Sequence, residues 1–414
     1  MEDSNIIENE QKELSLEEII EIKNKLQDDA IDAWYNNNCV GTLNLYTGAG
    51  KTFCFFKALY QVWPKGDKLS DVWFCSETLA REYDVRVEAE KFGMIYGKNP
   101  LEDFNIRFEI YQSVHKLKNE SISFVCLDEI QDCITPVRIN FLKNNYFKMK
   151  LGLTATPGIE KVVVPNPKIT KGQYYNKYCP IIYSYHTIDA VDEGIYSKIK
   201  IDVLFMDLDK TNKYKLFKNG NPCTEMAYYS YFDRKYMTEF GKNKMFAAMK
   251  RSSCLSDMPG RIKKAKMLVD LYEANNKKTV IIGNSLDALS QITSNVVQSR
   301  PAKEKYINEE LRYKFDNNLI KTLGSFKILQ QGANLNSMHN LILYSHFKDE
   351  DKFLQRLGRA RLGKDTTRIT IFCFRDTVEQ NNVELFIRPF KNVSLYDNFE
   401  EYYEKRNTEI TTAP

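Results

Sequence analysis

The chain has 414 residues, of which 43% are hydrophobic and 28% charged, with a formal net charge of +4. This length favours two α/β domains over a single core. The longest apolar runs fall well short of the roughly 18 residues that a membrane span requires, so the pattern excludes a membrane role. The acidic start lacks a secretory signal pattern, and nine scattered cysteines without close pairs argue against a zinc site or a disulfide framework. We therefore expect a cytoplasmic protein with reduced thiols, in the host cytoplasm if the chain is phage-encoded.

Charge is distributed unevenly along the chain. Residues 1–33 carry eleven acidic residues against three lysines, whereas residues 210–251 carry ten lysines and arginines against three acids. A lysine-rich run of this kind fits a solvated face, or a surface that follows phosphates and stacks bases. The second alternative is favoured by the aromatic residues interleaved with the run, which are Tyr214, Phe217, Tyr228, Tyr229, Tyr231, Phe232 and Tyr236.

The first predicted elements are helical. Residues 15–18 read Ser-Leu-Glu-Glu, a capping box that opens an apolar-periodic helix. A second helical pattern begins at Gln27 and places Ala30, Ile31 and Trp34 on one face. On this pattern alone, Gln27 could be an ordinary surface residue.

Residues 43–52 read Leu-Asn-Leu-Tyr-Thr-Gly-Ala-Gly-Lys-Thr, an apolar strand pattern followed by a glycine turn, and a helical pattern follows at residues 53–62. Such a turn points backbone N–H groups inward, and the helix N-terminus adds partial positive charge. Lys51 can then reach the β- and γ-phosphates, and the Thr52 hydroxyl can ligate Mg²⁺. We predict a phosphate-binding loop made of Thr47, Gly48, Ala49, Gly50, Lys51 and Thr52.

The next strand patterns end in polar residues. Residues 71–75 predict a strand that ends at Ser76-Glu77-Thr78, and a helix is expected over 79–92. Residues 107–110 predict a short strand that leads to Tyr111-Gln112-Ser113-Val114. The ends of strands are where open α/β sheets bind ligands.

Residues 121–127 predict a buried strand that delivers Asp128-Glu129-Ile130-Gln131 at its carboxyl end. Asp128 suits coordination of Mg²⁺ through water, and Glu129 suits positioning and polarising an attacking water. An Asp-Glu pair is weak evidence alone, but its position downstream of a phosphate loop strengthens it. A further strand over 148–153 ends in Thr154-Ala155-Thr156-Pro157, whose two hydroxyls fit either a hydrogen-bonded link to the carboxylates or a plain turn.

In this order the motifs resemble those of the superfamily 2 helicases. Residues 47–52, 128–131 and 153–157 look like motifs I, II and III of that family, and Gln27 falls where an adenine-reading glutamine is expected. The resemblance implies ATP as the nucleotide, with Mg²⁺. Residues 74–78 and 111–114 are similar to motifs Ia and Ib, which touch the nucleic-acid backbone in the family. The implied nucleic-acid contacts are Ser76, Thr78, Gln112, Ser113 and, further along, Asn284.

The second half predicts another α/β unit. Residues 158–261 are irregular, with one clear strand over 199–205, and a helix over 262–274 then leads to a strand over 279–282. The strand ends in Gly283-Asn284-Ser285, which looks like motif IV. Residues 327–335 resemble motif V, with Asn334 where many relatives have Asp. The residues implied in coupling ATP to movement are Gln131, Thr154, Thr156 and Gly332.

Residues 355–363, Gln-Arg-Leu-Gly-Arg-Ala-Arg-Leu-Gly, resemble motif VI, which supplies arginine fingers to the nucleotide. Gln355, Arg359 and Arg361 are the candidates. The family commonly has a second arginine where this chain has Leu362. Either Arg361 takes its place through a shifted turn, or Arg359 is the sole finger.

The resemblance implies an α/β fold of two RecA-like P-loop domains, with parallel sheets flanked by helices and the ATP site in the cleft between them. We predict an N-terminal domain over 1–203, a helical connector over 204–260, a C-terminal domain over 261–385 and a tail over 386–414. The compact size and motif V look most like the phage UvsW-type and type III restriction branch. They imply a monomeric, ATP-dependent helicase or translocase on DNA, single-stranded, duplex or branched. An RNA helicase and an ATP-gated clamp that does not unwind remain alternatives.

Overall fold

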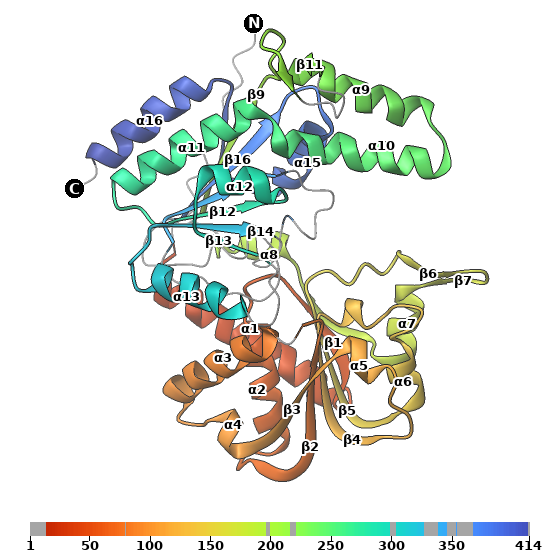
Figure 1. The fold of residues 1–414 in the computed structure, drawn as a ribbon. Helices are drawn as coiled ribbons and strands as arrows, with labels where there is room; N and C mark the ends of the chain where they lie inside the picture. The colour runs from red at the N-terminus through yellow and green to blue at the C-terminus, as the bar shows by residue number, and fades with distance from the viewer. Residues whose placement is uncertain are drawn as a thin grey trace, which may run out of the picture. The chain divides into compact units, whose positions relative to one another are not determined.

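The computed structural model describes residues 14–78, 80–195, 199–215, 221–298, 304–326, 338–345, 353 and 367–412. The chain divides into two compact units (Figure 1), unit 1 comprising Met1–Ile195 and unit 2 comprising Tyr196–Pro414. Within the described ranges, no helix is both long and apolar enough to span a bilayer.

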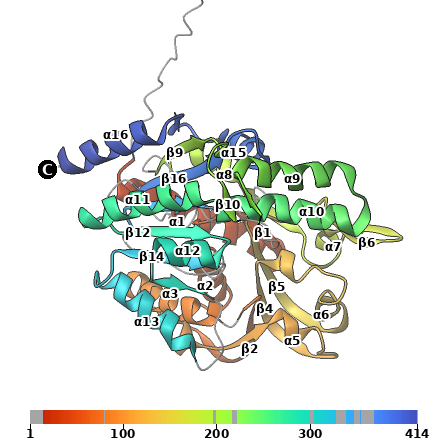
Figure 2. The same ribbon diagram turned by 45° about the horizontal axis from the view of Figure 1, so that its top comes forward.

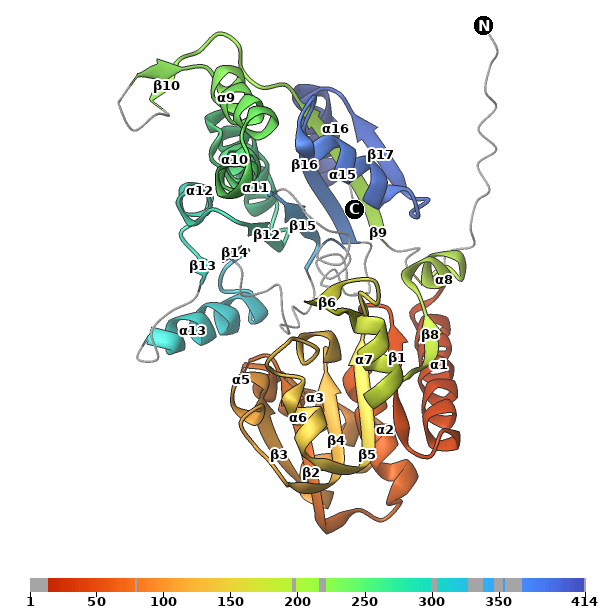
Figure 3. The ribbon, with the colours of Figure 1, turned by 90° about the vertical axis from the view of Figure 1, so that its right-hand side faces the viewer.

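Unit 1 is built on a six-stranded sheet in the order β3-β2-β4-β5-β1-β8, and its strands pair in parallel. The register places Asn44 beside Thr154 and Leu153 beside Asp128, so the carboxyl ends of β1, β5 and β4 meet at one edge. The strand order begins with β3 and ends with β8, which lies next to β1 (Figure 3). The strands are β1 (Val40–Leu45), β2 (Asp67–Ser76), β3 (Phe104–Ile110), β4 (Ser121–Asp128), β5 (Tyr146–Thr154) and β8 (Ile181–Tyr185).

Helices cover both faces of this sheet, with α1, α2 and α3 on one side and α5, α6 and α7 on the other (Figure 1). The Ser15–Glu18 capping box opens α1, as the sequence predicts. The remaining elements are α1 (Leu16–Asn36), α2 (Lys51–Val62), α3 (Ala80–Tyr96), α4 (Pro100–Asp103), α5 (Tyr111–Val114), η1 (Ile130–Asp132), α6 (Asn140–Asn144), β6 (Val162–Pro165), β7 (Lys168–Thr170), α7 (Lys171–Tyr178) and α8 (Thr187–Asp192).

Alternate residues of the unit 1 strands fill two separate aromatic layers, as the period of two in a strand requires. On one face Phe124 packs against Trp34, with ring centroids 5.5 Å apart. On the other face Trp73 stacks on Phe141 at 6.3 Å. The sheet is therefore packed on both faces.

Unit 2 has a seven-stranded parallel sheet in the order β13-β14-β12-β15-β16-β9-β17. Its elements are β9 (Ile199–Met206), β10 (Tyr214–Lys215), β11 (Pro222–Cys223), α9 (Glu225–Thr238), α10 (Gly241–Ser253), η2 (Cys254–Asp257), α11 (Pro259–Ala274), β12 (Thr279–Gly283), α12 (Leu286–Ile292), β13 (Val296–Val297), α13 (Lys305–Asp316), β14 (Thr322–Phe326), β15 (Asn340–Leu343), β16 (Thr367–Phe374), α15 (Val378–Ile387), β17 (Val393–Tyr396) and α16 (Phe399–Thr412).

A buried ion pair ties three elements of unit 2 together. Arg261 of α11 donates to Glu379 of α15 at 2.9 Å and to the Tyr344 carbonyl after β15 at 3.0 Å. Both charged side chains are almost fully buried, so each relies on the other for compensation.

The domain boundaries differ from those predicted. The strand run around residues 199–205 is β9, which pairs with β16 and β17 in the second sheet, so the boundary at 203 was placed inside a strand of unit 2. Residues 386–414 are no separate tail, because they add β17 to that sheet and α16 to the unit 2 core. Residues 158–198 also hold strands β6, β7 and β8, which the sequence pattern did not predict.

The predicted fold class is confirmed: each unit is a parallel sheet flanked by helices. The prediction holds because the apolar runs form buried strands at the expected positions and their polar ends meet at one edge of the sheet.

Candidate nucleotide site

The predicted phosphate loop joins β1 to α2. Gly48 and Gly50 have φ angles of 101° and 86°, a region that residues with a side chain rarely adopt. A Cβ at Gly50 would also lie 2.4 Å from Gln27 Nε2. The backbone conformation therefore favours glycine at position 50, and a side chain there would also displace the Gln27 amide. Lys51 and Thr52 follow as the first residues of α2.

Gln27, on α1, contacts this loop directly. Its Nε2 donates a buried hydrogen bond of 2.8 Å to the Ala49 carbonyl. Its Oε1 is buried and has no hydrogen-bond partner among the described residues. A buried acceptor without a donor is costly, so this oxygen is suited to an incoming N–H group such as the amino group of adenine.

The two predicted magnesium residues share a cation that the sequence reasoning missed. Arg81 Nε lies 2.7 Å from Asp128 Oδ2, and Arg81 Nη2 lies 2.6 Å from Thr52 Oγ1. Burial alone would lower the pKa of Arg81, but the charges of Asp128, Glu88 and Asp84 outweigh burial and raise it. The guanidinium is thus a permanent positive charge between the two oxygens. Carboxylate and hydroxyl oxygens that already converge on one cation have the donor chemistry that Mg²⁺ prefers.

We expect Arg81→Ala to lower the free energy of unfolding of the nucleotide-free chain by about 3 kcal/mol, because Asp128 would remain buried without a counter-charge. Added Mg²⁺ should restore part of that loss in the variant and have less effect on the parent. Urea unfolding with and without Mg²⁺ measures both quantities. Equal stability and equal Mg²⁺ response in parent and variant would contradict the idea that Arg81 compensates Asp128 at a cation position. Arg81→Lys, which keeps the charge, is the control and should lose less.

Glu129 is held in an unusual backbone conformation immediately after β4. Its φ is 50°, in the left-handed region that a non-glycine residue enters only when the surroundings impose it. Its Oε1 lies 3.7 Å from Lys51 Nζ. Its Oε2 accepts a 2.8 Å hydrogen bond from Gln131 Nε2. The carboxylate predicted to act on water therefore lies next to the lysine predicted to hold the phosphates.

The three predicted coupling residues of unit 1 form one chain of hydrogen bonds. Thr154 Oγ1 donates to Gln131 Oε1 at 2.7 Å, and Thr156 N donates to Thr154 Oγ1 at 3.0 Å. Together with the Glu129 contact, this chain links β4 to the loop after β5. The sequence left a plain turn open for residues 154–157, and the observed bonds show that the two threonines are instead connected to the carboxylate segment.

Two residues outside the predictions support this segment. Tyr111 donates to the Asp128 carbonyl at 2.9 Å, and Lys171 donates to the Gln131 carbonyl. Burial, with the charges of Glu129 and Glu77, raises the pKa of Asp132 to about 6. Because this pKa exceeds the unfolded value, Asp132 stabilises the fold at low pH, and that contribution is lost as the pH rises through about 6.

Comparison with solved structures decides the fold. Two structures of Dbp5 from S. cerevisiae, both bound to RNA and ADP BeF3, match 95% of this chain at 12% identity, with TM-scores of 0.60 and 0.62. The match covers 96% and 95% of the Dbp5 chains. The chain therefore has the fold of these structures, with two RecA-like units that are each a parallel sheet flanked by helices.

A third similar structure is that of the ATP-dependent Type ISP restriction-modification enzyme LlaBIII bound to DNA. It has 12% identity and a TM-score of 0.55 over 94% of this chain and 32% of the enzyme. No protein-family model and no curated protein sequence matches the chain. The identities are too low to carry function across, so the similarity supports the fold alone.

The residues compared with motifs Ia and Ib lie at or just after the ends of the adjacent strands β2 and β3. Ser76 Oγ donates to the Thr78 carbonyl at 3.0 Å, and Ser113 Oγ donates to the Ile110 carbonyl at 3.0 Å. Gln112 Nε2 donates to Glu77 Oε1 at 3.2 Å, which joins the two segments. The structure brings these residues to one edge, and their contact with nucleic acid stays a prediction.

The remaining predicted residues belong to the second half of the chain. Asn284 follows β12, and its N–H donates to Ser345 Oγ at 2.7 Å. Four further candidates lie outside the described residues, so their roles stay predictions: Gly332, Gln355, Arg359 and Arg361.

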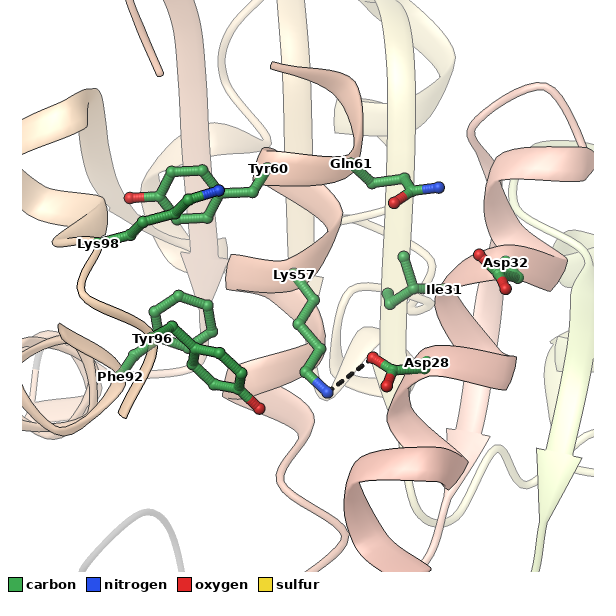
Figure 4. Close-up of a pocket in the computed structure, with 9 residues that line it drawn as sticks. All are labelled: Asp28, Ile31, Asp32, Lys57, Tyr60, Gln61, Phe92, Tyr96 and Lys98. Atoms are coloured by element: carbon green, nitrogen blue, oxygen red, sulfur yellow. Dashed lines mark hydrogen bonds and ion pairs between the residues drawn. The ribbon is translucent and has the colours of Figure 1, made fainter. Parts of the chain in front are cut away.

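Unit 1 also contains a cavity of about 540 Å³, lined from α1, α2 and the end of α3 (Figure 4). Lys57 Nζ lies 2.8 Å from Asp28 Oδ1 there, and the Tyr60 and Phe92 rings stack with centroids 5.9 Å apart. None of the nine residues drawn belongs to the phosphate loop. The cavity is therefore separate from the predicted nucleotide site. The lining residues are Asp28, Ile31, Asp32, Lys57, Tyr60, Gln61, Phe92, Tyr96 and Lys98.

Proposed function

We propose that this chain is an ATP-dependent helicase or translocase that acts as a monomer on DNA, moving along or remodelling branched DNA. The observation that supports this most is the connected set at the carboxyl edge of unit 1. Lys51 lies 3.7 Å from Glu129, which is hydrogen-bonded to Gln131, which in turn is hydrogen-bonded to Thr154. A phosphate-binding group, a carboxylate for water and a relay to another loop are thus joined through three neighbouring strands.

Each part has a role in ATP hydrolysis. The loop N–H groups and Lys51 bind the phosphates, and Gln27 orients the base through its buried oxygen. Thr52 and Asp128 would hold Mg²⁺, which supplies positive charge against the charge that develops on the transferring phosphoryl group. Glu129 orients and polarises the attacking water. The hydrogen bonds through Gln131 and Thr154 connect the nucleotide site to the loop at Thr156. Through them, that loop responds to whether ATP is bound.

DNA is the first choice of substrate. The sequence resemblance to the phage UvsW-type and restriction branch supports it, and the LlaBIII structure of the same fold contains DNA. The second candidate is an RNA helicase, favoured by the end-to-end match to Dbp5, whose structures contain RNA. Phosphate contacts alone do not separate the two, because both backbones carry the same charge.

A matched series of nucleic acids separates the candidates. ATP turnover should be stimulated most by a fork, less by linear duplex and least by RNA, since a fork presents duplex and single strand together. Stimulation should fall steeply between low and high salt, because each neutralised phosphate releases counterion. The assay uses fork, duplex, single-stranded DNA and RNA of equal length at two salt concentrations. Strongest stimulation by RNA would overturn the DNA assignment in favour of the second candidate.

A further inference from the structure

Unit 2 carries a helical hairpin between β9 and α11. Helices α9 and α10 fold back on each other through Glu239 and Phe240 and run side by side (Figures 1 and 2). Neither helix contributes to the sheet. The hairpin has no role in the proposed hydrolysis of ATP. It lies largely within residues 210–251, the segment rich in lysine, arginine and aromatic residues.

The base of the hairpin is fixed to unit 2. The Glu225 carboxylate accepts hydrogen bonds from Gly260 N at 2.8 Å and Asp209 N at 3.0 Å. The hydroxyl of Tyr229, which is buried, accepts from Val378 N at 3.0 Å. An ion pair of 2.8 Å between Asp233 and Arg251 then joins the two helices. The hairpin is therefore attached at a defined place, which a binding surface needs.

The connection between the two helices and the following helix α10 expose large apolar side chains. Phe240 is 83% exposed and Phe246 is 58% exposed. Three methionines are exposed as well: Met237 is 67% exposed, Met245 65% and Met249 53%. We call these five residues the hairpin tip. Single exposed apolar residues are ordinary, but a group of them on one helical hairpin indicates a contact with a partner.

Cations lie against the rings of the same hairpin. Lys235 Nζ is 4.8 Å from the Tyr231 ring centroid, and Lys250 Nζ is 5.9 Å from that of Phe246. Residues 234–250 contain five lysines and arginines and one acid, Glu239. A surface for an apolar protein partner gains little from this charge. Exposed rings with adjacent cations match a ligand that has flat apolar faces on an anionic backbone.

We propose that the hairpin tip binds single-stranded nucleic acid, with bases stacked on Phe240 and Phe246 and phosphates paired with Lys242, Lys244 and Lys250. Duplex is a poorer ligand, because its bases are already stacked on one another. This inference deepens the proposed function and rests on it: the tip would hold the single strand at a fork.

The test compares Phe240→Ala/Phe246→Ala with the parent. We expect the affinity for a single-stranded oligonucleotide to fall about tenfold, the range for removing stacking rings, with duplex affinity and basal ATP turnover unchanged. Tyr146→Ala is the matched control, since Tyr146 is an exposed ring, 66% accessible, in unit 1. Lys242→Gln/Lys244→Gln should weaken binding and reduce the salt dependence. Thermal unfolding of each variant checks that these substitutions leave the fold intact.

A direct readout uses Phe240→Trp, whose fluorescence should be quenched by the oligonucleotide if a base stacks on the ring. Unchanged affinity in the alanine variant, together with no quenching, would overturn the tip assignment. If nucleic acid still stimulated ATP turnover in that case, the proposed function would stand without it. The parent could also prove to be a dimer that the alanine variant converts to a monomer, with single-strand binding unchanged. That result would show that the tip joins two copies of the chain, and it would also overturn the proposal.

Discussion

Glu129→Gln should bind ATP as tightly as the parent and hydrolyse it about 10²- to 10⁴-fold more slowly, the usual contribution of a positioned general base. The amide keeps the size of the side chain and can still accept the hydrogen bond that Gln131 donates to Glu129. It loses the negative charge that polarises water. Single-turnover hydrolysis of radiolabelled ATP, with affinity from a fluorescent nucleotide, measures both quantities.

Lys51→Ala is the comparison that separates chemistry from binding. It removes a charged contact to phosphate, so nucleotide affinity should fall about 10- to 100-fold. Glu129→Gln should show no such fall. Parent-like turnover in Glu129→Gln would show that the carboxylate has been assigned the wrong role, whatever the behaviour of Lys51→Ala.

Truncating Arg359 should lower the rate of ATP hydrolysis about 10³-fold, because an arginine finger stabilises the charge that develops on the transferring phosphoryl group. Arg361→Ala tests the shifted register, in which Arg361 is a second finger and its loss slows hydrolysis as well. Turnover with saturating nucleic acid is the measurement. Arg388, an exposed arginine on the surface of unit 2, supplies the control, and Arg388→Ala should be neutral.

Parent-like turnover in Arg361→Ala would leave Arg359 as the only finger. Parent-like turnover in Arg359→Ala would remove the motif VI assignment altogether.

Local patterns were enough to predict which residues meet at the carboxyl edge of the unit 1 sheet. The glycine turn, the Asp128–Glu129 pair and the two threonines each follow a buried strand, and parallel strands bring such ends to one edge. Gln27 could be placed near the loop because of its resemblance to a known motif. The contacts among these residues then follow from the register of β1, β5 and β4.

Arg81 could not be predicted in this way. Its partner Asp128 lies 47 residues further along the chain, and the two meet because β2 pairs with β4. A single arginine one turn after Thr78 carries no periodic signal. The left-handed backbone at Glu129 was equally hidden, because a non-glycine residue enters that region only under tertiary constraint.

The order of strands in unit 2 could not be predicted from local sequence patterns either. β17 has only four residues and reads as a weak alternation, yet it pairs in parallel with β9, almost two hundred residues earlier in the chain. Assigning β9 to the first domain followed from its position in the sequence. Its buried partners β16 and β17 place it in the second.

The rate of ATP hydrolysis with and without nucleic acid, measured on the parent chain with Glu129→Gln as the blank, tests the central claim most directly. We expect slow basal turnover, a large increase on adding forked DNA and no increase in the variant. Parent turnover that stays at the level of the Glu129→Gln blank in the presence of DNA and of RNA would contradict the assignment of this chain as a nucleic-acid-dependent ATPase.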